Sequence, residues 1–118
     1  VFVAQDARMN EVYAGAFVVN VDDHARALGT EQVCAPGAVT MPDGGHWGST
    51  GSGWTVHGES LRARLGDALA GTPESDELPH ALDLLALGRA AFAHGEGVGA
   101  AQVAPVYLRD QVTQPRAV

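Results

Sequence analysis

The sequence has no lysine, one cysteine and no long apolar run, and each absence narrows what the chain can be. Its seven basic residues are all arginines and face fourteen acids, which gives a formal net charge of −7. Because this charge repels phosphate backbones at long range, autonomous nucleic-acid binding is not expected. The lone cysteine, Cys34, cannot form an internal disulfide, which favours a reducing, cytoplasmic setting.

Apolar residues are too scattered for a membrane protein. The longest apolar runs, residues 14–19 and 84–87, fall far short of the roughly twenty residues that a membrane-spanning helix needs. With 118 residues, 46% hydrophobic and 18% charged, the composition fits one compact domain with a packed core. The chain opens directly on the strand-like residues 1–4, so we interpret it as a fragment of a longer protein.

Alternating apolar residues predict an antiparallel meander in the first third of the chain. The first strand starts at Val1, and the second covers residues 11–19. A third strand is expected over residues 30–35, stopped by Pro36. A short strand is predicted near residues 47–50.

Two helices are predicted in the second half. The first covers residues 60–69 behind Ser60, a residue type that caps helices. The second runs from Pro79 to about His94, with Gly95 as a left-handed cap. Its apolar arc is expected to face a sheet, and it contains Leu78, Ala81, Leu82, Leu85, Gly88 and Phe92. Residues 101–108 are then expected to return to the sheet as an extended segment.

Two segments are more specific than this pattern. Residues 6–13 read Asp-Ala-Arg-Met-Asn-Glu-Val-Tyr, and residues 104–109 read Ala-Pro-Val-Tyr-Leu-Arg. They resemble the signature segments of the TsaB (YeaZ) family, also labelled glycoprotease-like or peptidase M22-like. Between them, residues 51–54 resemble the family's Gly-x-Gly loop, and residues 78–79 resemble the start of its last long helix.

The resemblance implies an α/β fold, the C-terminal lobe of an actin-like (ribonuclease-H-like, ASKHA) protein. The expected lobe has a three-stranded antiparallel meander plus further strands, with helices packed on the sheet. It occupies residues 1–118 as a single unit, and the N-terminal lobe is absent from the chain.

The family also implies a function. Its members take part in making threonylcarbamoyladenosine beside the anticodon of tRNA, as the noncatalytic partner of TsaD with help from the ATPase TsaE. The resemblance therefore implies a scaffold or activator without a cofactor, and not an enzyme. It further implies pairing through the missing lobe, either as a homodimer or with TsaD.

The first motif has a structural and a functional interpretation. Asp6, Arg8 and Glu11 stand at a turn between strands, where they could form a small charged site. The structural interpretation has Asp6 binding turn amides, Arg8 pairing with an acid and Tyr13 half-buried. We favour the structural interpretation.

The second motif also has two interpretations. Pro105, Tyr107, Leu108 and Arg109 are expected to return the chain to the sheet, with Tyr107 and Leu108 packing on opposite sides. The alternative is a contact surface for TsaD or TsaE, since Tyr and Arg are frequent anchors in interfaces.

The glycine-rich residues 48–53 expose amides ahead of a helix, which is typical of a phosphate-binding loop. The segment lacks the lysine of a P-loop. In actin-like ATPases a glycine pair at a comparable place contacts adenosine, so Gly51 and Gly53 resemble a degenerate copy of that nucleotide loop. A plain tight turn is the structural alternative. A nucleotide-binding module of the actin-like ATPase superfamily is therefore one alternative function.

A glycoprotease-like hydrolase is the other alternative, and it needs a metal site or a nucleophile. His80 and His94 lie about 21 Å apart along a helix, too far to share one ion. His46 and His57 flank the glycine-rich loop and are expected to be exposed. Cys34 is expected to be an inert buried thiol. The serines of the loop lack a Gly-x-Ser-x-Gly context, so no catalytic residue and no metal ligand is assigned.

Overall fold

The computed structural model describes residues 1–21 and 24–109, which fall into two compact units. Unit one is Val1–His80 and unit two is Ala81–Val118, a division that no composition shift in the sequence predicts. Each unit is described separately below.

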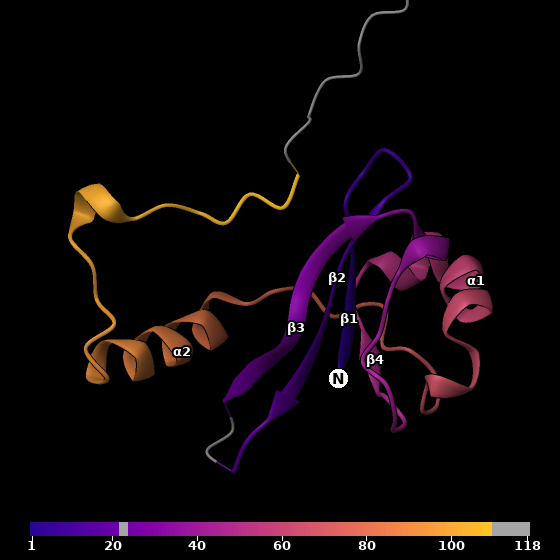
Figure 1. Ribbon diagram of the computed structural model, residues 1–118, viewed down its shortest axis with the longest axis horizontal. Helices are drawn as coiled ribbons and strands as arrows, with labels where there is room; N and C mark the ends of the chain where they lie inside the picture. The colour runs from indigo at the N-terminus through magenta and orange to yellow at the C-terminus, as the bar shows by residue number, and fades with distance from the viewer. Residues whose placement is uncertain (22–23, 110–118) are drawn as a thin grey trace, which may run out of the picture. The chain divides into compact units, whose positions relative to one another are not determined.

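Unit one is built on a four-stranded sheet in the order β3-β2-β1-β4 (Figure 1). Its strands are β1 (Phe2–Asp6), β2 (Val12–Val19), β3 (Ala25–Cys34) and β4 (Ser49–Thr50). The first three are antiparallel, and β4 runs parallel to β1. The predicted meander and the short strand near residues 47–50 are thus confirmed.

The third strand, β3, starts at Ala25 and not at residue 30 as expected, because it includes an irregular segment around Gly29. The pairing of β2 with β3 shifts register between Ala14 and Ala16, and Gly29 in β3 has a φ of +81°. A glycine in the left-handed region accommodates such a bulge without a steric cost. The strand therefore continues through residues whose apolar alternation is broken.

The first helix, α1 (Gly53–Leu65), begins at Gly53 and not at Ser60 as expected. Gly53 and Gly58 are weak helix formers, and His57 lies at a kink with φ −124° and ψ 16°. Burial of Trp54 compensates, since tertiary packing overrides propensity. The helix ends before Gly66, and residues 66–68 form a 3₁₀ turn, so the expected end at residue 69 is also wrong.

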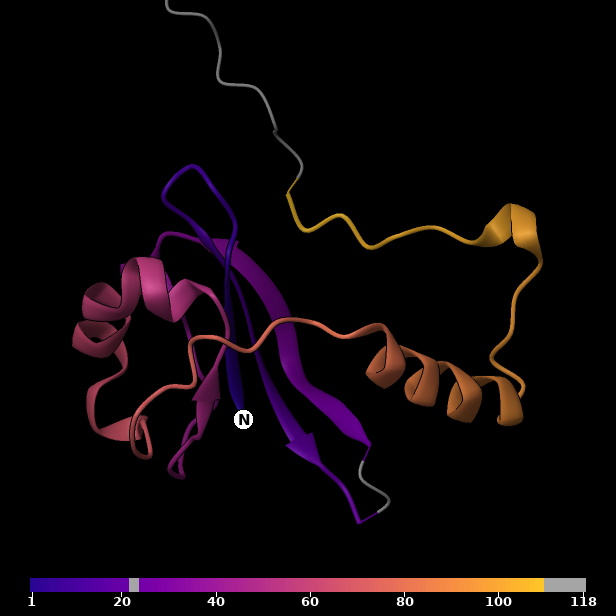
Figure 2. The same cartoon turned by 180° about the vertical axis from the view of Figure 1, so that it is seen from behind.

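Helix α1 lies on one face of the sheet, and the core fills the space between them (Figures 1 and 2). The buried core comprises Phe2, Ala4, Val12, Ala14, Ala16, Val39, Trp54, Leu61 and Leu65. The Phe2 and Trp54 rings meet edge to face, with centroids 6.4 Å apart. A short 3₁₀ turn, Pro36–Ala38, brings Val39 into this core.

Unit two contains the second helix, α2 (Ala81–Ala93), within the predicted residues 79–94. Gly95 has a φ of +78°, and its N–H donates to the Phe92 carbonyl at 3.0 Å. The Glu96 N–H donates to the Ala91 carbonyl at 3.0 Å, which completes the predicted glycine cap. None of the helices in the described residues is both long and apolar enough to cross a lipid bilayer.

No residue of α2 is buried within unit two, and the expected packing of its apolar arc on a sheet stays a prediction. The expectation of one extended segment over residues 101–108 is wrong. Residues 100–102 form a 3₁₀ turn, and residues 103–109 form no strand. An extended sequence becomes a strand only when a neighbouring strand offers free N–H and C=O groups, and Pro105 itself lacks an N–H.

The packing of α1 on the sheet yields a stability prediction. Leu61→Ala removes a fully buried side chain and is expected to lower the free energy of unfolding by about 2–5 kcal/mol. Val56→Ala on the same helix alters a largely exposed side chain and is expected to cost little. Urea denaturation followed by circular dichroism measures both, and equal losses would contradict the assigned core.

Candidate functional site

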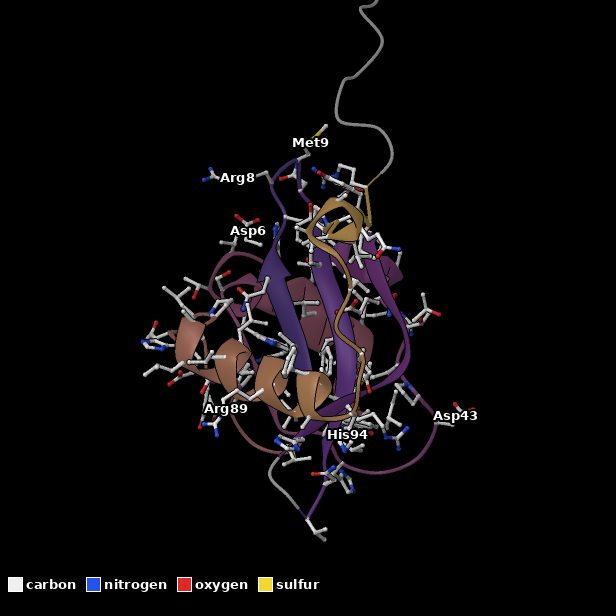
Figure 3. All side chains as sticks on the ribbon, turned by 90° about the vertical axis from the view of Figure 1, so that its left-hand side faces the viewer. Asp6, Arg8, Met9, Asp43, Arg89 and His94 are labelled. Carbon is white, nitrogen blue, oxygen red and sulfur yellow. The ribbon has the colours of Figure 1, made fainter. Side chains whose placement is uncertain are left out.

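The turn between β1 and β2 holds its residues in an unusual backbone conformation. Arg8, Met9 and Asn10 have φ values of 62°, 54° and 59°, which non-glycine residues rarely adopt. The Asp6 carboxylate stabilises the turn, since its Oδ1 accepts the Arg8 N–H at 3.2 Å. Figure 3 shows Arg8 and Met9 projecting from the tip.

The base of this turn is tied to the start of α1 by two polar side chains. The Ser52 hydroxyl donates to Gln5 Oε1 at 2.7 Å and accepts the Asp6 N–H at 3.1 Å. The Ser52 N–H donates to the same Gln5 oxygen at 3.2 Å. The proton of this hydroxyl is therefore committed to Gln5, and the contacts of Ser52 are those of a structural residue.

His57 adds a contact that the sequence did not predict. Its Nε2 lies 3.4 Å from Asp6 Oδ1, and the two side chains are 13% and 26% exposed. This distance is short enough for an ion pair. The contact is not a hydrogen bond, and the buried Nε2 atom has no hydrogen-bond partner. His57 is thus not the exposed loop histidine that was expected, because α1 begins at Gly53 and places His57 beside Asp6.

Gly51 and Gly53 are required by close packing against β1. A Cβ at Gly51 would overlap the Ala4 carbonyl oxygen, and Gly51 has a φ of +113°. A Cβ at Gly53 would lie 2.8 Å from the same oxygen. The loop amides are also engaged, since the Gly51 N–H donates to the Glu74 carbonyl at 3.0 Å. The structure thus gives both glycines a packing role, and the suggested nucleotide contact stays a prediction.

Tyr13 of the first motif lies in β2, whereas Arg8 lies in the turn before it. Tyr13 is 37% exposed, close to the expected half-burial. The Arg8 guanidinium forms no ion pair within the described ranges, so its expected pairing with an acid is wrong. Its side chain instead projects from the tip of the turn (Figure 3).

The second motif lies in unit two. Tyr107 is 77% exposed, whereas Leu108 and Arg109 are partly exposed and Pro105 is exposed. No strand forms over residues 103–109, and the expected packing of Tyr107 and Leu108 on opposite sides of a sheet stays a prediction. The two motifs belong to different units.

The remaining candidate ligands do not gather around an ion. Across residues 1–21 and 24–109, no group of three His, Cys, Asp or Glu side chains is close enough to hold a metal. His46 is exposed, as expected. An open hollow of about 540 Å³ lies elsewhere in unit one, and it is lined by Val1, Gly48, Ser49, Thr50, Ala70, Thr72, Glu74 and Glu77.

Cys34 is half-buried at the end of β3, so the expected full burial is wrong. Burial raises the pKa of its thiol, and the Glu11 carboxylate raises this pKa further. The Cys34 Sγ also lies 3.8 Å from Gln32 Oε1 as a weak donor. A thiol in these surroundings is a poor nucleophile near neutral pH, which agrees with the inert role expected for it.

The close contact of Gly51 with the Ala4 carbonyl predicts that one added methyl group lowers the stability strongly. Gly51→Ala places a Cβ against the Ala4 carbonyl in a left-handed conformation and is expected to destabilise unit one by about 2 kcal/mol or more. Gly48→Ala is the matched control, because its Cβ would meet nothing within 4 Å. Thermal unfolding measures the difference, and a Gly51→Ala protein as stable as the control would refute the packing role.

The raised pKa of Cys34 predicts slow alkylation. The rate of reaction with iodoacetamide should rise with pH around a midpoint above that of the urea-unfolded chain. Because the folded pKa is raised, the contribution of this thiol to stability is present below the unfolded pKa and is lost as pH rises through the folded one. Glu11→Gln should move the alkylation midpoint down, and an unchanged midpoint would contradict the role of Glu11.

Comparisons with known proteins place this geometry in a family. No protein-family model matches the chain. The tRNA threonylcarbamoyladenosine biosynthesis protein TsaB of Haemophilus influenzae is 31% identical over 96% of this chain and 49% of that protein. The protein of the same name from Escherichia coli is 32% identical over 95% of this chain and 48% of its own length.

Solved structures agree with the sequence matches. A Pseudomonas aeruginosa protein described as similar to peptidase YeaZ superposes with a TM-score of 0.76 at 38% identity, covering 92% of this chain and 48% of that one. YeaZ from Pseudomonas aeruginosa gives a TM-score of 0.70 at 36% identity, covering 90% and 48%. The four-stranded sheet with its helices is thus similar to the YeaZ structures, and this mixed α/β arrangement fits a lobe of an actin-like fold. The chain belongs to the TsaB (YeaZ) family, and it spans about half the length of the relatives that it matches.

Proposed function

We propose that residues 1–118 form one lobe of a two-lobed TsaB-type protein, the C-terminal lobe. The match to about half of each relative supports this assignment. The element order also supports it, because three antiparallel strands are followed by a short 3₁₀ turn, by β4 as a parallel edge partner of β1, and then by helix α1. The N-terminal lobe is then the half that the chain does not span.

The proposed function is a noncatalytic role in forming threonylcarbamoyladenosine on tRNA, as a scaffold or activator of TsaD acting with TsaE. The observation that carries it is the identity of 31% and 32%, over nearly the whole chain, to two proteins named for this biosynthesis. The cytoplasm, where tRNA is modified, is the proposed location.

The use made of the polar residues supports a noncatalytic role. The Ser52 hydroxyl donates to Gln5 and accepts the Asp6 N–H, and an Asp6 carboxylate oxygen accepts the Arg8 N–H within the turn. These groups stabilise the hairpin and are not arranged around a reacting atom. The chemistry is assigned to the partner, and this chain acts by favouring the partner's competent conformation.

Charge supports the same division of labour. With a net charge of −7, the chain is poorly suited to holding a tRNA by itself. The partners are therefore expected to supply the positive surface that binds the tRNA phosphates.

The test replaces the matching half of Escherichia coli TsaB with this chain and supplies the hybrid to cells depleted of their own TsaB. We expect the hybrid to restore threonylcarbamoyladenosine in tRNA, measured by mass spectrometry of nucleosides, and to copurify with TsaD. The unmatched half alone, without this chain, is the control and is expected to restore none. A hybrid that folds, shown by a cooperative thermal transition, yet neither restores the nucleoside nor binds TsaD would contradict the proposal.

A further inference from the structure

The loop between the 3₁₀ turn Pro36–Ala38 and β4 contains an Asp-Gly pair at residues 43–44. Of all the aspartates in the sequence, only Asp43 is followed by a glycine. Because glycine has no Cβ, its backbone nitrogen can approach the preceding side chain without steric hindrance. The backbone nitrogen of Gly44 is therefore a potential nucleophile toward Cγ of Asp43.

The structure leaves both reacting groups of this pair unengaged. Asp43 is exposed, and Figure 3 shows it at the periphery of unit one. Its carboxylate forms no hydrogen bond or ion pair with any of residues 1–21 and 24–109. The Gly44 N–H likewise donates to no group in the described part of the chain. No competing contact therefore holds the carboxylate and the amide nitrogen apart.

Two consecutive glycines give this loop the backbone freedom that closing a small ring requires. Gly44 and Gly45 have φ values of +78° and +88°. Glycine populates the left-handed and right-handed regions about equally, so the loop can change conformation at little cost. A Cβ placed at Gly44 would meet nothing within 4 Å, so no neighbouring group packs against the attacking residue.

We propose that Asp43 and Gly44 form a site of spontaneous succinimide formation and conversion of aspartate to isoaspartate. The Gly44 nitrogen bonds to Asp43 Cγ, and the bond from Cγ to one carboxylate oxygen breaks. That oxygen leaves as water with the amide proton and one proton from solvent.

Hydrolysis of the five-membered ring completes the conversion. Water that adds at Cγ restores aspartate. Water that adds at the main-chain carbonyl of Asp43 breaks its bond to the Gly44 nitrogen, so the chain then runs through Cγ as isoaspartate. The new carboxyl returns the proton taken up in the first step. The mass of the protein is unchanged, and no oxidant or reductant is consumed.

The conversion alters a loop that is attached to the core through Trp47. The Trp47 indole N–H donates to the Gly44 carbonyl at 3.2 Å, and the Trp47 side chain packs against the buried core. An isoaspartyl linkage inserts one methylene into the backbone ahead of Gly44, which displaces this carbonyl from the indole. One carboxylate replaces another, so the net charge stays the same. The modification therefore changes the geometry of the loop and not its charge.

The experiment incubates the folded chain at neutral pH and then adds purified L-isoaspartyl methyltransferase with labelled S-adenosylmethionine. This enzyme methylates the carboxylate that isoaspartate exposes, and peptide mapping locates the label. We expect the label at residue 43 to increase with time of incubation. Asp67 is the internal control, because it is also exposed but is followed by an alanine, and it should gain no label.

Variants test the assigned nucleophile. Gly44→Ala should slow the conversion about tenfold or more, which corresponds to about 1.4 kcal/mol in the activation barrier. Gly45→Ala is the matched control, since it alters the neighbouring left-handed glycine and leaves the Gly44 nitrogen open. It should retain most of the conversion. Asp43→Asn should speed up ring formation, because ammonia leaves more readily than a carboxylate oxygen.

Three outcomes would overturn the proposal. Label at residue 43 in the urea-unfolded chain but not in the folded one would mean that the fold prevents ring closure. Equal label at Asp67 would mean that Gly44 does not select the site. Equal rates for Gly44→Ala and Gly45→Ala would mean that the Gly44 nitrogen does not control the reaction. None of these measurements involves tRNA modification, so the proposal and the proposed function can fail separately.

Discussion

The close contact between the glycine loop and the backbone of β1 determines the arrangement of unit one. Gly51 and Gly53 both lie against the Ala4 carbonyl, at a separation that no side chain permits. This contact brings the start of α1 onto the sheet, so that Trp54 meets Phe2 and Leu61 is fully buried. The small side chains of Ala4, Ala14 and Ala16 on the same face leave room for the helix.

The same contact ties the base of the hairpin tip to the start of α1. Since the loop lies against β1, Ser52 reaches Gln5 and the Asp6 amide, and His57 reaches the Asp6 carboxylate. The strained turn at residues 8–10 is therefore held from below by α1 and from within by Asp6. The acidic residue Asp6 of the family motif therefore stabilises the turn in this structure. Arg8 and Met9 project from the tip of that turn.

In unit two, local sequence signals and not packing define the ends of the helix. The cap at Gly95 and the first-turn Asp83 define where α2 begins and ends, yet the helix has no buried residue. Local signals fix the ends of a helix because capping bonds are made within a few residues. Burial of an apolar helix depends instead on the surface that packs against it, which the helix's own sequence does not encode.

The sequence by itself determined the meander, the short β4, the span of α2 and the family, because apolar alternation, proline and glycine positions and the two motifs are local features. It did not determine where α1 begins, since Gly53 and Gly58 oppose helix formation and only packing of Trp54 and Leu61 on the sheet stabilises that segment. The contact of His57 with Asp6 and the register shift opposite Ala14 were likewise decided by tertiary structure. In each case the deciding contact joins residues far apart in sequence, so the free energy that selects it is absent from any local pattern.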